Sequence, residues 1–120
     1  MNGHQENERS ARLAGRARFD NLCAVCWTGL PTTGTEASHR VPRSALGWCP
    51  CNVLVLHAEC HRMMHAHPEG ARALGVHVSR HADPRTVPVH TPHGPVWLRC
   101  DTTHTYAHTH TVRLEIGADQ

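Results

Sequence analysis

The chain has 120 residues, of which 39% are hydrophobic and 4% aromatic. A chain of this length and composition can bury one modest core, so we expect a single small domain that relies on a staple such as a metal ion. The net charge is +2 with histidine counted neutral, and the 12 basic residues and 13 histidines suit a phosphate partner. The first ten residues form no apolar run and no segment is apolar enough to span a bilayer, which predicts a cytoplasmic protein without a secretory signal.

Residues 1–20 are expected to form an N-terminal basic arm. The first eight residues are polar, and Arg9–Phe19 mixes small apolar residues with arginines in a pattern that predicts a short helix, weakened by Gly15. Two interpretations stay open. The arginines either contact a DNA backbone or form an ordinary solvated helix face.

A pair of cysteines follows this arm. Cys23 and Cys26 are separated by two residues, so both sulfurs can turn toward one ion. In a reducing compartment, six cysteines are expected to be metal ligands or buried thiols rather than a disulfide framework. The pair alone fits half of a zinc site or a redox pair, although a redox pair would favour a βαβ context that is absent here.

The centre of the chain predicts a strand, a loop, a second strand and a helix. Ala37–Val41 is short enough for a strand, and Pro42 breaks it and opens a loop. Val53–Leu56 is a continuous apolar run that favours a second strand. Ala58–Ala66 lacks glycine and proline and is stopped by Pro68, which predicts a helix.

Histidines on this helix have the spacing of metal ligands. His61 and His65 are four residues apart, so both imidazoles project from one face and can hold the same ion. His57 and Cys60 form a second pair with a two-residue gap at the start of the helix. This second pair could complete a tetrahedral site with Cys23 and Cys26.

Residues 81–120 are expected to form a strand-rich extension. Before it, residues 69–74 predict a helical turn that ends at Gly75, followed by a strand-like segment at 76–78. Residues 87–90 and 95–100 predict two strands around a turn, and residues 108–116 predict one more. Cys100 is interpreted as a buried or free thiol. The histidines at 104, 108 and 110 are interpreted as a polar strand face or tail rather than as a metal site.

The central stretch resembles a known family. His39 precedes Pro42 and Arg43, and an asparagine, an apolar strand and a Cys-His pair follow; this order resembles the zinc-containing branch of the HNH endonucleases, the ββα-metal nucleases. Their motif continues Asn-Leu-x-x-Leu-Cys-x-x-Cys-His-x-x-x-His. The segments HPEGARALGV and DPRTVPV are also similar to segments of small HNH proteins of actinobacterial phages. In the register of the family motif this chain supplies Asn52, Leu56, Cys60, His61 and His65.

The resemblance implies an α+β fold. It places a small ββα-metal core stapled by zinc over residues 21–80, flanked by the N-terminal helix and a C-terminal β-hairpin. It also implies a metal-dependent endonuclease that hydrolyses phosphodiester bonds of double-stranded DNA. His39 would be the general base, and His61 and His65 would hold a divalent cation such as Mg²⁺ or Mn²⁺. Asn52 would pin the loop that orients His39, or in some members lie beside the metal. Phosphate contacts are expected from Arg40, Arg43 and Arg62.

The structural zinc is expected to be separate from the catalytic cation. Its implied ligands are Cys23, Cys26, His57 and Cys60, with His57 at a position where the family usually has cysteine. Cys49 and Cys51 are alternatives to the last two ligands. The matching register and the direct connection to the helix favour His57 and Cys60.

One position departs from the family in a way that affects catalysis. Ser38 replaces the usual Asp or His ligand before the general base, and Glu36, two residues away on the same strand face, can compensate only in part. The rival hypothesis is therefore a non-catalytic zinc module, with a degenerate HNH site, that binds DNA or a protein. The modest net charge predicts weak sequence-independent DNA binding by this chain alone, which favours help from a second copy or an accessory protein.

Overall fold

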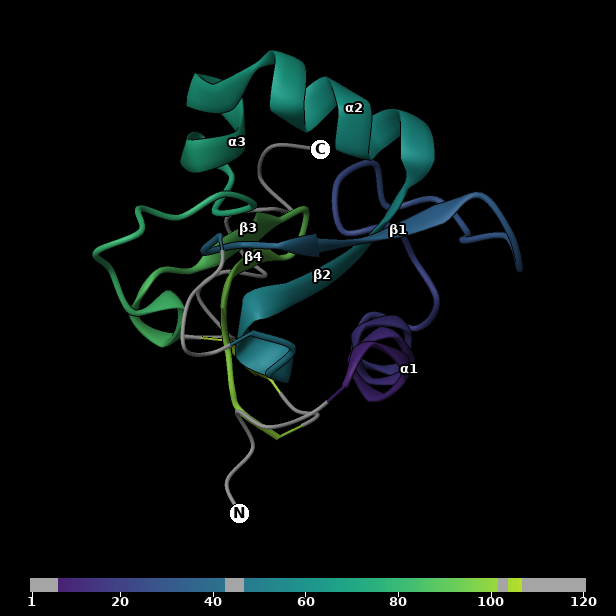
Figure 1. The fold of residues 1–120 in the computed structure, drawn as a ribbon, viewed down its shortest axis with the longest axis horizontal. Helices are drawn as coiled ribbons and strands as arrows, with labels where there is room; N and C mark the ends of the chain where they lie inside the picture. The colour runs from purple at the N-terminus through teal and green to yellow at the C-terminus, as the bar shows by residue number, and fades with distance from the viewer. Residues whose placement is uncertain (1–6, 43–46, 102–103, 107–120) are drawn as a thin grey trace.

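Two antiparallel strands lie at the centre of this computed structural model, which describes residues 7–42, 47–101 and 104–106 (Figure 1). Strand β1 (Thr35–His39) pairs with β2 (Val53–His57), from Thr35 opposite His57 to His39 opposite Val53. The first four residues of β2 are all buried, because helices contact the pair from both sides. The predicted first strand is thus shifted by two residues toward the N-terminus. Arg40 and Val41 instead follow the strand and join the loop that Pro42 opens.

Helix α1 (Glu8–Arg18) confirms the predicted N-terminal helix. Its first turn is capped by Asn7, whose side-chain oxygen accepts a hydrogen bond from the Ser10 amide at 2.9 Å. Gly15 has a packing role in this helix. A Cβ atom at this position would lie 2.8 Å from Val55 Cγ2, so the glycine permits the close approach of α1 to β2.

Three arginines of α1 make hydrogen bonds to other parts of the protein. Arg12 contacts Glu8 and Thr35, and Arg16 donates to the carbonyl groups of two loop residues. Arg18 is 6% exposed and donates to the carbonyl oxygens of Pro50 and Val53, at 2.8 and 2.7 Å. Arg18 therefore belongs neither to a DNA-contacting arm nor to a solvated face.

Helix α2 (Ala58–Ala66) begins directly after β2 and has the predicted bounds. A shorter helix, α3 (Pro68–Ala73), follows it, as the predicted helical turn indicated. The strand expected at residues 76–78 is not formed. The amides of Val76 and His77 instead donate to Ala71 O and close the C-terminal end of α3.

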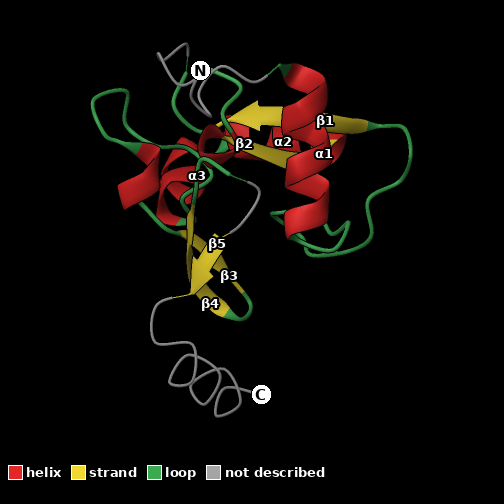
Figure 2. Ribbon diagram, turned by 90° about the horizontal axis from the view of Figure 1, so that it is seen from below, coloured by secondary structure: helices red, strands yellow, loops and turns green. Residues whose placement is uncertain are grey.

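A second antiparallel sheet forms the C-terminal part of the described chain. It contains β3 (Val89–Thr91), β4 (Gly94–Leu98) and β5 (His104–Tyr106), in that order. The predicted hairpin is confirmed by β3 and β4, and Figure 2 shows this sheet projecting from the part of the molecule that holds the helices. The strand predicted at 108–116 lies outside the described residues, as do the side chains at 104, 108 and 110.

One hydrophobic core connects the two sheets. It includes Leu54 and Leu56 of β2 together with Val89, Val96 and Leu98 of the second sheet, all at most 1% exposed. The fold is therefore α+β, with three α-helices and two small antiparallel sheets among the residues described. None of the described helices is both long enough and apolar enough to cross a membrane.

Candidate metal centre and histidine pocket

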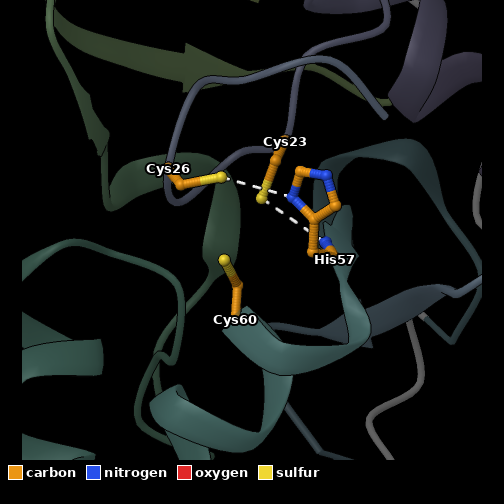
Figure 3. A group of neighbouring side chains, drawn as sticks. All are labelled: Cys23, Cys26, His57 and Cys60. Carbon is orange, nitrogen blue, oxygen red and sulfur yellow. Dashed lines mark hydrogen bonds between the residues drawn. The ribbon is translucent and has the colours of Figure 1, made fainter. Parts of the chain in front are cut away.

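The four expected zinc ligands converge in space (Figure 3). Cys23 and Cys26 lie on the loop between α1 and β1, His57 ends β2, and Cys60 lies in the first turn of α2. Their ligand atoms all lie within 4.8 Å of one another. Tetrahedral zinc with Zn–S bonds of about 2.3 Å places sulfurs roughly 3.8 Å apart, so a small closure of these side chains would complete the site. A Cys₃His set of this kind fits a structural metal such as zinc.

Backbone amides donate hydrogen bonds that hold the Cys23 side of the cysteine–histidine cluster in place. The amides of Val25 and His57 each donate to Cys23 Sγ at 3.4 Å. The turn that carries the two cysteines is closed by Trp27 N, which donates to Cys23 O at 2.9 Å. Trp27 adopts φ of 60°, a left-handed conformation that reverses the chain after Cys26. The local fold thus turns both sulfurs toward one point.

The imidazole of His57 is oriented by a carbonyl group. His57 Nε2 lies 2.9 Å from Gly29 O, and because a carbonyl oxygen only accepts, Nε2 carries the proton. This leaves Nδ1, which lies 3.2 Å from Cys26 Sγ, as the ligand atom. A metal-binding histidine commonly donates its other ring nitrogen in this way.

Two cysteines of the cluster, Cys26 and Cys60, have pKa values shifted in opposite directions. Burial raises the pKa of Cys26, but hydrogen bonds with Thr28, Cys23 and Cys60 outweigh burial and lower this pKa to about 6. Burial, followed by the hydrogen bond with Cys26, raises the pKa of Cys60 to about 12. Zinc binding would therefore release a proton from Cys60.

Cys49 and Cys51 are not part of this cluster. They lie in a separate group with Cys100, whose sulfur atom belongs to the segment after β4. Cys49 and Cys51 therefore do not replace His57 and Cys60 beside Cys23 and Cys26.

The three histidines expected to act in catalysis line one cavity of about 590 Å³. His39 reaches it from the end of β1, and His61 and His65 reach it from one face of α2. The other walls come from β1 and the loop before β2. The complete lining is Ala37, Ser38, His39, Pro42, Gly47, Trp48, His61 and His65.

His61 and His65 have the geometry of two ligands on one ion. Their Nε2 atoms lie 3.1 Å apart, and an ion bound at about 2.0–2.1 Å from each nitrogen requires a separation close to this. The Glu36 carboxylate lies 3.9 Å from His61 Nδ1, on the other side of the ring. Burial and the charge of His65 lower the pKa of His61, while Glu36 acts in the opposite direction. Glu36 therefore faces His61 and favours its orientation toward the cavity.

Asn52 holds the loop that separates His39 from the second strand. Its side-chain oxygen accepts from Val41 N at 2.8 Å, and its side-chain nitrogen donates to Val41 O and Gly47 O at 3.1 Å each. Asn52 is 0% exposed and does not belong to the cavity lining. Its position fits the expected role as a loop pin rather than a place beside the metal. The His39 ring lies against Trp48 at the far end of this loop, with ring centroids 4.3 Å apart.

The expected role of Arg40 in phosphate binding is wrong. Arg40 is 0% exposed, and its guanidinium is directed inward by buried carbonyl groups. A side chain in this position cannot reach a DNA backbone. The four carbonyl acceptors, at 2.6–3.1 Å, belong to Gly75, Cys51, Pro84 and Val87.

The other two expected phosphate contacts have different outcomes. Arg62 is exposed on α2 and lines a cavity beside Cys26 and Cys60, on the side of the cysteine–histidine cluster. Arg43 lies outside the described residues.

A basic groove next to the histidine cavity was not anticipated from the sequence. It shares His39 and His65 with that cavity and continues over the segment after α3. The His77 ring lies 4.9 Å from the His65 ring, and burial, followed by the charges of His65, His61 and Arg72, lowers the pKa of His77. The sequence signal was the HVSRH segment at residues 77–81, of which the strand prediction at 76–78 covered only the first two residues. The groove owes its basic character to Arg72, His77, Arg80 and His81.

Comparison with known proteins adds no relative. No family model matches the chain, and neither a curated protein nor a solved structure matches it.

Proposed function

We propose that this chain is a metal-dependent DNA endonuclease of the HNH, or ββα-metal, type. The observation that carries the proposal is the convergence of His39, His61 and His65 on one cavity, at the junction of an antiparallel strand pair and the helix that follows it. Three imidazoles in one cavity provide both a base and metal ligands.

The roles of the histidines follow from their positions. His39 accepts the proton of the attacking water, a task suited to an imidazole that titrates near neutral pH. His61 and His65 would hold the cation through their Nε2 atoms, which lie 3.1 Å apart. A divalent cation such as Mg²⁺ or Mn²⁺, when bound there, supplies charge stabilisation to the scissile phosphate and the leaving 3′ oxygen.

The surroundings support these roles. Asn52 ties the loop after β1 to the core, and Trp48 lies against the His39 ring, so both limit the movement of the base. Glu36 favours the orientation of His61 in which Nε2 faces the cavity. The cysteine–histidine cluster would fix the start of α2 and thereby the position of His61.

The groove beside the cavity supplies a path for the DNA backbone. Arg72 and Arg80 line it, and it opens onto the same His39 and His65 that line the histidine cavity. Arginine binds phosphate through a planar fork of donors, so these side chains suit the phosphates next to the scissile one. Double-stranded DNA is the substrate that the HNH resemblance implies, with 3′-hydroxyl and 5′-phosphate products.

The proposal is tested by nicking of supercoiled plasmid. Zinc-loaded protein should nick the plasmid when Mg²⁺ or Mn²⁺ is added, and His39→Ala should lower the rate by roughly 10²-fold or more, as for other general bases. His90→Ala is the matched control, because this histidine is exposed on β3 and lines neither the cavity nor the groove. Equal nicking by His39→Ala and wild type would refute the assignment of the base.

The second candidate function is a zinc module that binds DNA or a protein without cutting. The observation that favours it is Ser38, which lines the histidine cavity with a neutral hydroxyl where the family usually has a metal ligand. Zinc-loaded protein that binds DNA but never nicks it with either metal would support this function over catalysis.

A further inference from the structure

We propose that Cys49, Cys51 and Cys100 form a second metal site, which takes a thiophilic cation such as Zn²⁺ and joins the C-terminal sheet to the core. The three ligand sulfurs lie within 4.8 Å of one another. Cys100 lies far from Cys49 and Cys51 in the sequence, and neither the nuclease proposal nor the first zinc cluster uses these three residues. The inference is therefore independent of the proposed function.

The fold holds two of the sulfurs together without a metal. Cys49 and Cys51 flank Pro50 at the start of the short helical turn η2 (Pro50–Asn52), and Asn52 N donates to Cys49 O at 2.8 Å. The two sulfurs lie 3.3 Å apart, and both residues are 0% exposed. A tight turn with proline has little freedom to separate them, so the pair is arranged in advance for one ion.

Cys100 completes the group from the other sheet. It follows β4, which ends at Leu98, and it is partly exposed while its two partners are buried. The η2 turn also contacts β4 and the turn at Pro84–Thr86. A metal held by all three sulfurs would therefore tie the second sheet to the segment that precedes β2.

The charge around the group favours a bound cation over a disulfide. Arg18 and Arg40 are buried, and they donate to the carbonyl oxygens of Pro50 and Cys51, within the same short segment. Arg18 Nε is also a buried nitrogen without a hydrogen-bond partner among the described residues. No aspartate or glutamate in the described chain is buried to balance these guanidinium charges.

Three thiolates around a divalent cation carry one net negative charge, whereas a disulfide and a thiol carry none. Buried charges are costly unless an opposite charge lies nearby, so the metal-bound state compensates the arginines better. Arg18 donates to the carbonyl oxygen of Pro50, the residue between Cys49 and Cys51, so its guanidinium lies beside the segment that carries both sulfurs.

The fourth coordination position would be taken by water on the side of Cys100. Arg85 lies on this side, with Nη1 at 3.8 Å from Cys100 Sγ, and Asp83 holds it in place at 2.7 Å. Arg85 therefore places a positive charge beside the Cys100 sulfur. A site with three protein sulfurs and one water is compatible with tetrahedral zinc.

The test is to count metal ions in the whole chain. The reduced protein, reconstituted with Zn²⁺ and desalted, is measured by native mass spectrometry, and we expect two zinc ions per chain. A single zinc ion per chain, lost in the Cys26→Ser variant, would overturn the proposal. One zinc ion together with a loss of two hydrogens at these cysteines would also overturn it, in favour of a disulfide.

Matched variants assign each ion to its cluster. Cys100→Ser changes the partly exposed ligand and should lower the count from two to one, and Cys26→Ser should do the same at the first cluster. The combined variant should hold none. A Cys100→Ser protein that keeps two zinc ions contradicts the proposal, and peptide mapping after alkylation shows which cluster remains filled. The wild-type count decides the matter even where a variant does not fold.

Discussion

The cysteine–histidine cluster and the histidine cavity use adjacent residues of α2, Cys60 and His61, but they differ in the number of ligands they offer. Cys60 faces the loop that carries Cys23, while His61 faces the cavity shared with His65. The first group offers four ligand atoms, and Cys23 is 0% exposed. The second offers two nitrogens 3.1 Å apart at the edge of an open cavity of about 590 Å³.

The difference shows that two adjacent residues of one helix can belong to sites with different numbers of protein ligands. Successive helix residues point about 100° apart, so one turn of α2 presents Cys60 to one side and His61 to another. A closed site with four protein ligands stabilises the fold, whereas an open site leaves positions for water and substrate. Changes to these neighbours should therefore have different consequences.

The largest effect is expected from Cys60→Ser compared with His61→Ala. Loss of Cys60 should release zinc and lower the free energy of unfolding by roughly 3 kcal/mol or more, since structural zinc contributes on the order of 10 kcal/mol to the folding of small domains. His61→Ala should keep zinc and lose nicking. Elemental analysis, thermal unfolding and plasmid nicking measure the three quantities. A zinc-replete, stable Cys60→Ser protein would refute the ligand assignment.

Substitution of a buried arginine and of an exposed arginine should have different effects on the free energy of unfolding. Arg40→Ala removes the donor to four carbonyl oxygens behind the histidine cavity, and we expect a loss of about 3 kcal/mol or more in unfolding free energy because these acceptors stay buried. Arg62→Ala, on the exposed face near the cysteine–histidine cluster, should change stability by less than about 0.5 kcal/mol. Denaturant unfolding of both variants checks this contrast, and equal stabilities would contradict the structural role of Arg40.

A smaller effect is expected from Ser38→Asp, which would add a protein ligand to the site in the histidine cavity. Ser38 lines the cavity, so a carboxylate there would add a third ligand and raise the nicking rate by roughly tenfold, equivalent to about 1.4 kcal/mol. Ser38→Asn is the matched control, because it has similar size and no charge. A folded Ser38→Asp protein without increased activity or metal affinity would show that the missing acid does not limit the site.

The smallest effect concerns the protonation of His61. Burial and His65 lower its pKa below 6.5, while Glu36 raises it. The unfolded chain then binds the proton more readily, so this residue's contribution to stability is present above pH 6.5 and is lost as the pH falls. Glu36→Gln should lower the pKa further. NMR titration of the imidazole without added Mg²⁺ or Mn²⁺ measures both values, and a higher pKa in the variant would contradict the effect of Glu36.

Local pattern was sufficient for the elements that carry the ligands. The bounds of α2 follow from a run without glycine or proline that ends before Pro68, and β2 follows from four consecutive apolar residues. The spacing of Cys23 and Cys26, and of His61 and His65, was also informative, because each pair depends on a single turn of the chain.

Features that depend on distant contacts could not be inferred in this way. The interior position of Arg40 depends on carbonyl groups that lie 11 to 47 residues away in the sequence. Around the shifted end of β1 and the missing strand at 76–78, the distant backbone bonds are those of Arg40 N to Asn52 O and of Val78 N to Arg40 O. Neighbouring residues do not reveal which carbonyl a side chain or amide will meet.

The sequence by itself determined the helix that carries His61 and His65 and the two ligand pairs, Cys23 with Cys26 and His57 with Cys60. These depend on periodicity and short spacing, which act over a few residues. The α+β class and the joining of both pairs in one zinc site were implied by the family resemblance. Only the tertiary structure decided that Arg40 is an internal support and that Cys49 and Cys51 meet Cys100 instead of the first cluster. The physical reason is that packing of the second sheet against the β2 region brings these residues together, and no local pattern encodes that packing.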